Sequence, residues 1–385
     1  MATVVLSPFR VASSPDWGGH FWVYMQYAAG LRRLGCEVYW LEQLRRGKDP
    51  DRDACAVATF RERMDRFGLG PRVLLYQVDD AADAPIEWVG VTQREAEAVL
   101  RRADLLLNFH YAIDPRMLAC ARRTALVDID PGLTQLWMST GQLSVPAHDV
   151  YFTIGETVGT PAARFPDCGV PWMHIRPPVC LELWPYVYDA RCEAFTTVAG
   201  WWSGKWVKVM EHGKEVCYDN NKRLAFLEYV RLPEMTSQPL ELALHLAERD
   251  VEDRRLLERH HWRVRAAQEA SGTPQRYQAY VQGSRGEWSC AKRFFVRLQN
   301  AWVSDRTVCY LASGKPAVVQ HTGPSAYLPN GEGLFRFTTL EEAATALEAI
   351  NADYERHCRA ARAIAEAYFD SKQVLERILS AALPR

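Results

Sequence analysis

Short apolar runs and amphipathic segments alternate along most of this chain. At its start, an apolar run at 3–6 is followed by a loop with two glycines, by apolar positions at helical spacing over 21–31, and by a second apolar run at 37–41. Apolar side chains that recur every three or four residues predict a helix, whereas short apolar runs bounded by turn residues predict strands. The opening elements are therefore predicted to be a strand, a loop, a helix and a strand.

The alternation continues as far as residue 154. The same patterns predict helices at 54–67, 94–102 and 115–122, and strands at 73–78, 104–109, 124–129 and 150–154. Strands that alternate with helices form parallel units in an open sheet with helices on both faces. We therefore expect the first part of the chain to be a doubly wound α/β domain.

Six prolines between residues 161 and 192 interrupt this pattern. A helix cannot run through such a segment, because proline lacks the backbone N–H and clashes with the preceding turn. We interpret the segment as the connection between two domains. The predicted N-terminal domain covers 1–176, and the predicted C-terminal domain covers 177–365.

The second half of the chain repeats the alternation. Its patterns predict strands at 195–199, 240–246, 277–281, 294–298 and 317–320, and helices at 222–230, 305–313, 340–350, 352–368 and 374–383. The stretch 247–276 is charged and rich in histidine, and its pattern assigns no element. Open α/β sheets bind ligands beyond the carboxyl ends of their strands, so two facing domains present two sets of loops to one cleft.

The composition is that of a globular protein. Of the 385 residues, 48% are hydrophobic and 24% are charged, which supplies apolar material for two cores. The formal net charge is −1, so neither sign is in excess to hold a nucleic-acid backbone or an anionic membrane surface. We therefore expect no nucleic-acid partner.

The ten cysteines include no CxxC pair, which argues against a zinc ribbon or a thioredoxin-type site. The chain does not begin with a basic segment followed by a long apolar one, and no apolar run approaches the roughly 20 residues that span a bilayer. We expect a cytoplasmic protein with reduced thiols and no transmembrane segment. Its oligomeric state stays open at this point.

The loop between the first predicted strand and helix contains Gly18, Gly19 and His20. Glycines allow a backbone to approach a ligand closely, and a helix N-terminus offers free N–H groups. We expect His20 to face the cleft, where it is a candidate general base. The alternative is a tight turn capped by histidine.

Asp128 and Asp130 close the predicted strand at 124–129. Asp130 falls at the carboxyl end of that strand, where active-site groups collect, and is the second candidate catalytic residue. The alternative is an N-cap before Pro131, since an acidic cap before proline is a common helix start. Asp128 is interpreted as structural.

Loops of the second half supply candidate contacts to an anionic ligand. A lysine on a glycine loop suits a diphosphate, and an arginine in the first turn of a helix opposes the helix dipole unless an anion lies nearby. The alternatives are a solvated lysine and a surface arginine. The candidate donor-binding residues are Ser203, Lys205, Glu287, Ser304, Asp305, Arg306, Thr322 and Gly323.

No set of residues has the spacing of a metal site. His260 and His261 are adjacent, but neighbouring side chains on a regular element point apart, and no further ligand completes a set. The sequence therefore predicts no metal centre.

Two segments resemble the GT-B glycosyltransferases. Residues 18–41, with Gly18-Gly19-His20 at the start of a helix, resemble the opening loop on the acceptor side of that fold. Residues 300–323 resemble its donor-side signature, a helix followed by Gly314, Pro316 and a strand. The last helices resemble the C-terminal pair of the family, so residues 366–385 are expected to pack back on the N-terminal domain.

The resemblance implies an α/β fold of two Rossmann-like domains that face a central cleft. It implies a glycosyltransferase of the hexosyltransferase type, similar to divergent bacterial members of the family 1 and family 4 type. A nucleotide-sugar donor would bind the second domain, and a small-molecule or glycan acceptor would bind the first. No metal and no cofactor besides the co-substrate are implied, because Lys205, Arg306 and the backbone at Thr322 and Gly323 match the positions that neutralise the leaving diphosphate.

The chain departs from the family at one place. Many retaining members carry two glutamates, eight positions apart, before the signature, and Ala301 and Cys309 occupy those positions here. Asp305, one turn upstream, is the expected substitute. Inversion would need a base near the acceptor hydroxyl, for which His20 or Asp130 would serve, and both stereochemical courses stay open.

Three other functions are compatible with parts of this pattern. A nucleotide-sugar epimerase or hydrolase would share the fold. A dinucleotide-dependent oxidoreductase would carry a GxGxxG motif, which the first loop lacks. A secreted two-lobed binding protein would need an export signal, which the start of the chain does not show.

Overall fold

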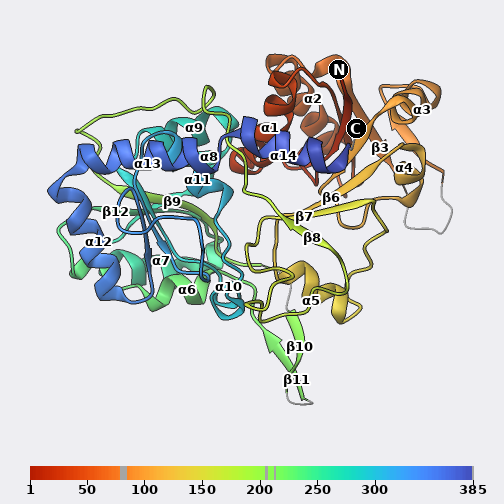
Figure 1. The fold of residues 1–385 in the computed structure, drawn as a ribbon. Coiled ribbons are helices and arrows are strands. Elements are labelled where there is room, and N and C mark those ends of the chain that lie inside the picture. Colours follow the sequence, from red (N-terminus) through yellow and green to blue (C-terminus); the bar gives the residue numbers. More distant parts are fainter. Residues whose placement is uncertain (79–84, 204–206, 212–213, 384–385) are drawn as a thin grey trace.

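The centre of the molecule is formed by two β-sheets, as seen in a computed structural model that describes residues 1–78, 85–203, 207–211 and 214–383 (Figure 1). The first sheet has eight strands in the order β4-β3-β2-β1-β5-β6-β7-β8, and only the β3–β4 pair is antiparallel. Its strands are β1 (Thr3–Ser7), β2 (Glu37–Gln43), β3 (Val73–Gln77), β4 (Glu87–Val89), β5 (Leu105–Asn108), β6 (Thr124–Asp128), β7 (Val150–Thr153) and β8 (Trp172–His174).

Helices connect these strands, and the first four of them confirm predicted helices, whereas α5 was not predicted. They are α1 (Gly18–Arg33), α2 (Pro50–Arg66), α3 (Gln93–Arg102), α4 (Pro115–Cys120) and α5 (Leu133–Ser139). The loop after α1 uses Gly35 at φ +82°, a conformation that costs glycine least. We call this sheet and its helices the first lobe.

The second sheet has six strands in the order β13-β12-β9-β14-β15-β16, and all of its pairs are parallel. Its strands are β9 (Phe195–Gly200), β12 (Leu240–His245), β13 (Arg263–Ala266), β14 (Gly286–Ser289), β15 (Ala317–Gln320) and β16 (Leu334–Phe337). Its helices are α6 (Arg223–Glu228), α7 (Val251–Arg259), α8 (Ala267–Ser271), α9 (Pro274–Gln282), α10 (Arg293–Leu298), α11 (Asp305–Ala312), α12 (Leu340–Ala352) and α13 (Tyr354–Tyr368). We call this part the second lobe, and the two lobes confirm the predicted α/β fold class.

Two predicted strands are wrong. The run at 277–281 lies in α9, which begins with Thr273 as its N-cap and Pro274 in its first turn. The run at 294–298 is α10, whose buried Phe294, Phe295 and Leu298 have helical spacing. A run of five residues is too short to distinguish a period of 3.6 from a period of 2.

The proline-rich segment, which we interpreted as a connection between domains, also contributes a strand to the first sheet. Its residues Trp172–His174 form β8, which pairs in parallel with β7 and extends the first sheet. A three-residue strand among prolines carries no periodic signal, so the sequence did not predict it. The crossing into the second lobe follows β8.

The last helix, α14 (Ser371–Ala382), leaves the second lobe and packs against α1 (Figure 1). The approach is close at Gly30 of α1, where an added Cβ would lie 2.4 Å from Cδ1 of Leu375. The chain crosses back beside the outgoing connection, because the backbone of Val179 exchanges hydrogen bonds with Phe369 and Ser371. The chain thus passes between the lobes twice.

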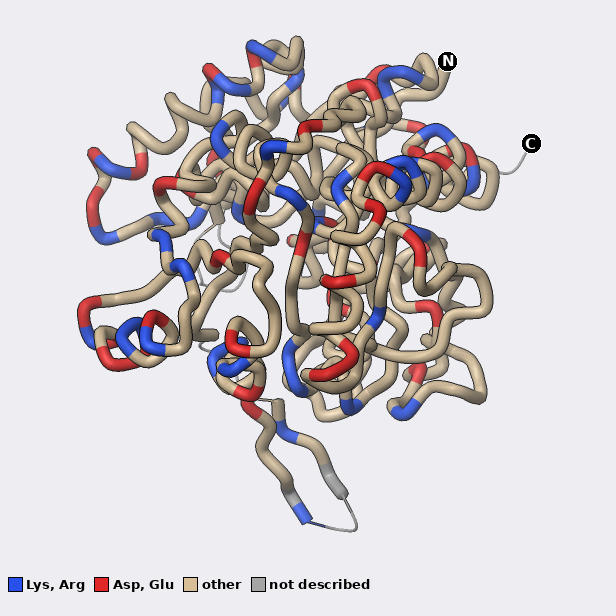
Figure 2. The backbone as a smooth tube through the Cα atoms, turned by 90° about the vertical axis from the view of Figure 1, so that its left-hand side faces the viewer, with Lys and Arg blue, Asp and Glu red and all other residues tan. Residues whose placement is uncertain are grey.

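A two-stranded hairpin of β10 (Val207–Glu211) and β11 (Lys214–Tyr218) projects from the body in both views (Figures 1 and 2). Charged residues of both signs are spread around the backbone without a single-sign face (Figure 2), in keeping with the net charge of −1. Among the described residues, no helix combines the length and the apolar character that a membrane crossing requires.

Candidate functional site

The topology places two ligand-binding crevices opposite each other. In a doubly wound sheet, the crevice lies where the strand order reverses, at the carboxyl ends of the two strands concerned. That position is between β1 and β5 in the first lobe and between β9 and β14 in the second. The loops after these strands line a cavity of 790 Å³, among them Phe9, Phe109 and His110 from the first lobe and Gly200 from the second.

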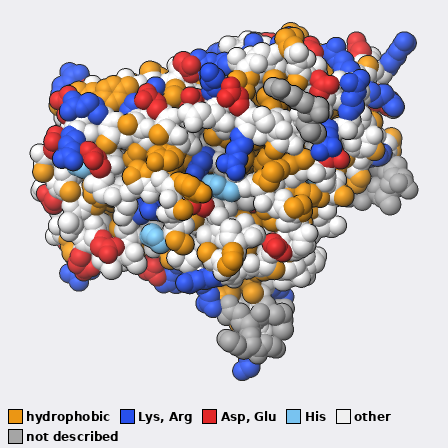
Figure 3. Space-filling view, in the orientation of Figure 1, with side chains coloured by type: hydrophobic (Ala, Val, Ile, Leu, Met, Phe, Trp, Pro, Cys, Tyr) orange, Lys and Arg blue, Asp and Glu red, His pale blue; other side chains and the backbone are white. Residues whose placement is uncertain are grey.

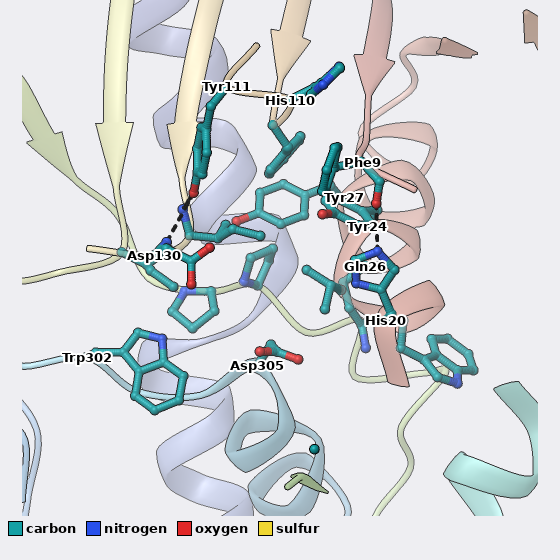
Figure 4. A pocket seen from close by; sticks show the side chains of 18 of the residues that line it. Phe9, His20, Tyr24, Gln26, Tyr27, His110, Tyr111, Asp130, Trp302 and Asp305 are labelled. Atoms are coloured by element: carbon teal, nitrogen blue, oxygen red, sulfur yellow. Dashed lines mark hydrogen bonds between the residues drawn. The ribbon is translucent and has the colours of Figure 1, made fainter. Parts of the chain in front are cut away.

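A second cavity of 330 Å³ adjoins the first on the side of the second lobe. The residues that line both cavities are His20, Asp130, Gly200, Lys222, Trp302 and Asp305. Figure 4 shows His20 and Asp130 on one side and Trp302 and Asp305 on the other. The junction of the two cavities is therefore where groups of both lobes meet.

His20 lies in the first turn of α1, with its ring held in one orientation. Its Nε2 is 2.6 Å from the carbonyl oxygen of Phe9, and because a carbonyl only accepts, Nε2 carries the proton (Figure 4). Burial lowers the pKa of His20, although the Phe9 carbonyl and Asp130 oppose this effect. The neutral ring therefore offers an unprotonated Nδ1 as a proton acceptor.

Asp130 follows β6, and hydrogen bonds to its backbone N–H hold it in place. Its N–H donates to the Tyr111 hydroxyl at 3.2 Å and to Oδ1 of Asp128 at 3.0 Å (Figure 4). Asp128 is fully buried and also accepts hydrogen bonds from Thr134 and Thr153. Within the described residues the carboxylate of Asp130 has no hydrogen-bond donor, so it is free to bind a ligand.

The second lobe contributes positive charge to the smaller cavity. Lys222 and Lys292 line it, and neither has a carboxylate partner in the part of the chain that the structure describes. Burial, together with the charges of Arg306 and Lys292, lowers the pKa of Lys222 to about 7. Burial also lowers the pKa of Lys292. Half-buried cations without carboxylate partners favour an anionic ligand.

Helix α11 points its N-terminus at the same cavity. Ser304 is the N-cap, and its hydroxyl accepts the N–H of Arg306 at 3.2 Å. Asp305 lines both cavities, and burial raises the pKa of its carboxyl. In the first turn of α11, the Asp305 side chain can therefore bind hydroxyl groups of a ligand, and the free backbone N–H groups can bind a negatively charged group.

Arg306 pairs with Glu287, which we expected in a loop. Its Nε donates to Oε1 of Glu287 at 2.7 Å, and its Nη1 donates to the carbonyl of Val198 at 2.9 Å. The predicted loop position of Glu287 is wrong, since it lies within β14, is fully buried and lines neither cavity. The negative charge that balances Arg306 in the first turn of α11 therefore comes from Glu287 of the protein itself and not from a bound ligand. Arg306 still lines the smaller cavity.

Replacing Glu287 by glutamine is expected to lower the free energy of unfolding by about 1.5–3 kcal/mol, because the buried guanidinium of Arg306 would lose its charged partner. Urea denaturation measures the change. Glu332→Gln is the matched control, since Glu332 pairs with Arg356 at the exposed surface, where the loss should stay below about 1 kcal/mol. Equal losses in the two variants would contradict the role of the Glu287–Arg306 pair.

Other candidate residues lie away from the junction. The hydroxyl of Thr322 donates to the carbonyl of Trp302 at 2.7 Å, and Gly323 lies against the backbone of Gln299, so the two border a separate space of 20 Å³. Ser203 lines neither cavity. Lys205 lies outside the described residues.

Gly18 and Gly19 begin α1 rather than a loop. A Cβ at Gly18 would lie 2.2 Å from the carbonyl oxygen of Thr273, and one at Gly19 would lie 2.9 Å from the ring of Tyr277. Gly19 also lines the smaller cavity. The glycines therefore let the start of α1 contact the second lobe, which brings His20 to the junction.

Lys222 was not among the predicted site residues, although one signal was present. It immediately precedes α6, where a cation opposes the helix dipole, which is the argument that singled out Arg306. Among the described residues, no group of three or more His, Cys, Asp or Glu side chains is arranged to hold a metal ion.

Comparison with known proteins identifies the architecture. No protein-family model and no curated protein sequence matches this chain. Among solved structures, an α-glucosyltransferase bound to UDP and a 13-mer DNA has a TM-score of 0.61 at 9% identity over 99% of each chain. AviGT4, a glycosyltransferase involved in avilamycin A biosynthesis, has a TM-score of 0.55 at 15% identity over 99% of this chain and 97% of its own. Anabaena Alr3699/HepE in complex with UDP-glucose has a TM-score of 0.58 at 13% identity over 99% and 100%. The chain therefore has the GT-B fold of these glycosyltransferases, with two Rossmann-like sheets facing a shared cavity.

Proposed function

We propose that the protein is a glycosyltransferase of the hexosyltransferase type, which moves a sugar from a nucleotide-sugar donor to a hydroxyl group of an acceptor. The observation that carries this proposal is the junction of the two cavities. There His20 and Asp130 of the first lobe face Lys222, Asp305 and the start of α11 in the second. A proton acceptor opposite an anion site is the arrangement that glycosyl transfer with inversion needs.

The donor is assigned to the second lobe. Lys222, Lys292 and the N-terminus of α11 supply positive charge for a diphosphate, and Asp305 supplies an acceptor for sugar hydroxyls. The structural neighbours include a UDP complex of an α-glucosyltransferase and a UDP-glucose complex of Alr3699/HepE. A uridine diphosphate sugar is therefore the first donor to test.

In the proposed reaction, the acceptor oxygen attacks the anomeric carbon of the sugar, and the bond from that carbon to the diphosphate oxygen breaks. Nδ1 of His20 takes the proton of the acceptor hydroxyl, and the carboxylate of Asp130 stabilises the resulting imidazolium. The departing diphosphate carries the developing negative charge. Lys222, Lys292 and the free N–H groups of α11 stabilise it, so the reaction is proposed to need no metal ion.

Titration calorimetry with UDP, TDP, GDP and NAD tests the proposal. Binding of at least one nucleoside diphosphate, with a matching rise in Tm, is expected, because a ligand that binds only the folded state stabilises it. Binding of NAD without binding of any nucleoside diphosphate would reject the transferase in favour of an oxidoreductase.

The affinity for UDP-glucose is expected to fall as the pH rises from about 7 to about 8.5. The pKa of Lys222 is about 7 in the free protein, and an adjacent diphosphate raises it because it favours the charged form. Binding then takes up a proton, and the Kd should rise toward about tenfold per pH unit. Calorimetry at several pH values in this range measures how the Kd of UDP-glucose depends on pH. Lys222→Arg should have a Kd that does not change with pH, because arginine stays charged throughout. A Kd of the native protein that does not change with pH would contradict the role of Lys222.

A further inference from the structure

The first-lobe side of the larger cavity is an aromatic wall. It is formed by Phe9, Tyr24, Tyr27, Phe109, Tyr111 and Trp137. Tyr24 and Tyr27 meet Phe109 edge to face, with ring centroids 5.3 and 4.7 Å apart. Such a wall favours a planar apolar ligand over a strongly hydrated sugar chain.

Two arginines lie at one corner of this wall, around Phe9. The guanidinium carbons of Arg10 and Arg45 are 5.0 and 5.9 Å from the centroid of the Phe9 ring. Neither has an ion-pair partner among the residues that the structure describes, and Nε of Arg10 is buried there without a hydrogen-bond acceptor. The neighbouring Arg46, by contrast, pairs with Glu87.

The corner is electropositive throughout. The rings of His110 and Phe9 are tilted by 32° with their centroids 4.9 Å apart, and burial together with Arg45 and Arg10 lowers the pKa of His110 to about 4. Burial and the charge of Arg45 lower the pKa of Arg10 as well. On the face of the molecule seen in Figure 3, basic and histidine side chains lie between two apolar patches. Like charges held together without a described carboxylate leave a place that an anionic group would stabilise.

Phe9 connects this corner to the proposed base. Its ring contacts both arginines, while its carbonyl accepts the hydrogen bond from His20 at 2.6 Å. Arg45 and His20 line the same cavity, so one ligand that lies along the aromatic wall can reach both.

Resting on the proposed function, we propose that the acceptor is a planar aromatic hydroxyl compound that carries a carboxylate or a similar anionic oxygen group. Arg45, which lines the cavity, binds the anionic group, and Arg10 adds positive charge beside it. The aromatic wall contacts the rings, and the hydroxyl lies at His20. Guanidinium groups match carboxylate geometry with paired hydrogen bonds, which gives the site its preference for an acid over a neutral analogue.

The test compares two matched pairs of probes, 4-hydroxybenzoate with 4-hydroxybenzamide and 6-hydroxy-2-naphthoate with 6-hydroxy-2-naphthamide. Their Kd values are measured by calorimetry in the native protein, in Arg45→Gln and in the control Arg46→Gln. In the native protein, an acid should bind at least about tenfold more tightly than its amide, the value expected of a charged hydrogen bond. This preference should disappear in Arg45→Gln and persist in Arg46→Gln.

Equal affinity of acid and amide, no binding of either acid, or a preference that survives in Arg45→Gln would overturn the inference. Loss of the preference in Arg46→Gln would also overturn it, since general surface charge would then be the cause. The Kd of UDP, measured in the same preparations, separates this inference from the proposed function. If UDP binds and the acids show no preference, only the acceptor class is wrong. If the acids show the preference and no nucleoside diphosphate binds, the transferase and the acceptor role are both rejected.

Discussion

Replacing His20 by alanine is expected to lower kcat by about 10²- to 10⁴-fold, with little change in the Kd of UDP. The reason is the fixed orientation of the ring, in which Nε2 donates to the Phe9 carbonyl and Nδ1 remains free to accept a proton. Burial keeps the ring neutral near pH 7 by lowering its pKa. Alanine removes the proton acceptor, whereas the cations that bind the diphosphate belong to the second lobe.

The measurement is initial-rate kinetics with UDP-glucose and the best acceptor, together with calorimetry of UDP binding. His260→Ala is the matched control, because His260 pairs with Glu234 at the surface, away from both cavities. A kcat that remains at the native level in His20→Ala would remove His20 as the base. A large loss of UDP affinity would instead place the donor at the first lobe, contrary to our assignment.

The double variant Lys222→Met/Lys292→Met is expected to lower kcat/KM for the donor by at least about 10³-fold. Both side chains line the smaller cavity, and neither is paired with a carboxylate of the described chain. Interactions that stabilise charge on a leaving group act most strongly in the transition state, and loss of one such donor typically costs about 10²- to 10³-fold in kcat. Methionine preserves much of the packing of both stems.

The single variants and Lys372→Met complete this experiment. Lys372 is exposed at the start of α14, so its loss should leave kcat/KM unchanged. Urea denaturation of the double variant should show no loss of stability, because the removal of two partly buried, unpaired cations removes a desolvation cost. Native kcat/KM in a folded double variant would contradict the assignment of the leaving diphosphate to this cavity.

Much of the fold could be predicted because local signals and tertiary structure agree. Helix α11 is an example, since Ser304 caps its N-terminus, Gly314 takes φ +71° after its end and Pro316 prevents its continuation. The failures at α9 and α10 occurred at mostly apolar runs of five residues, although Thr273 and Pro274 offered a helix start before α9. In both, the helix is recognised by which side chains are buried, and this depends on neighbours far away in the sequence.

In the candidate site too, local signals predicted some residues and missed others. His20, Asp130 and Asp305 could be placed because each adjoins the carboxyl end of a strand or the start of a helix, and the structure brings all three to one junction. Glu287 was misplaced because its partner Arg306 is 19 residues away and no local pattern links them. The one local signal at Lys222 is a cation just before a helix, and Arg45 carries none. What distinguishes both residues is a cavity that forms only when the two lobes meet.

A crystal structure of the protein with UDP tests the central claim most directly. The account predicts UDP at the junction of the two cavities, with its diphosphate in hydrogen-bond contact with Lys222 or Lys292 and with the start of α11. UDP bound elsewhere, or bound at the junction with its phosphates directed away from these lysines, would contradict it.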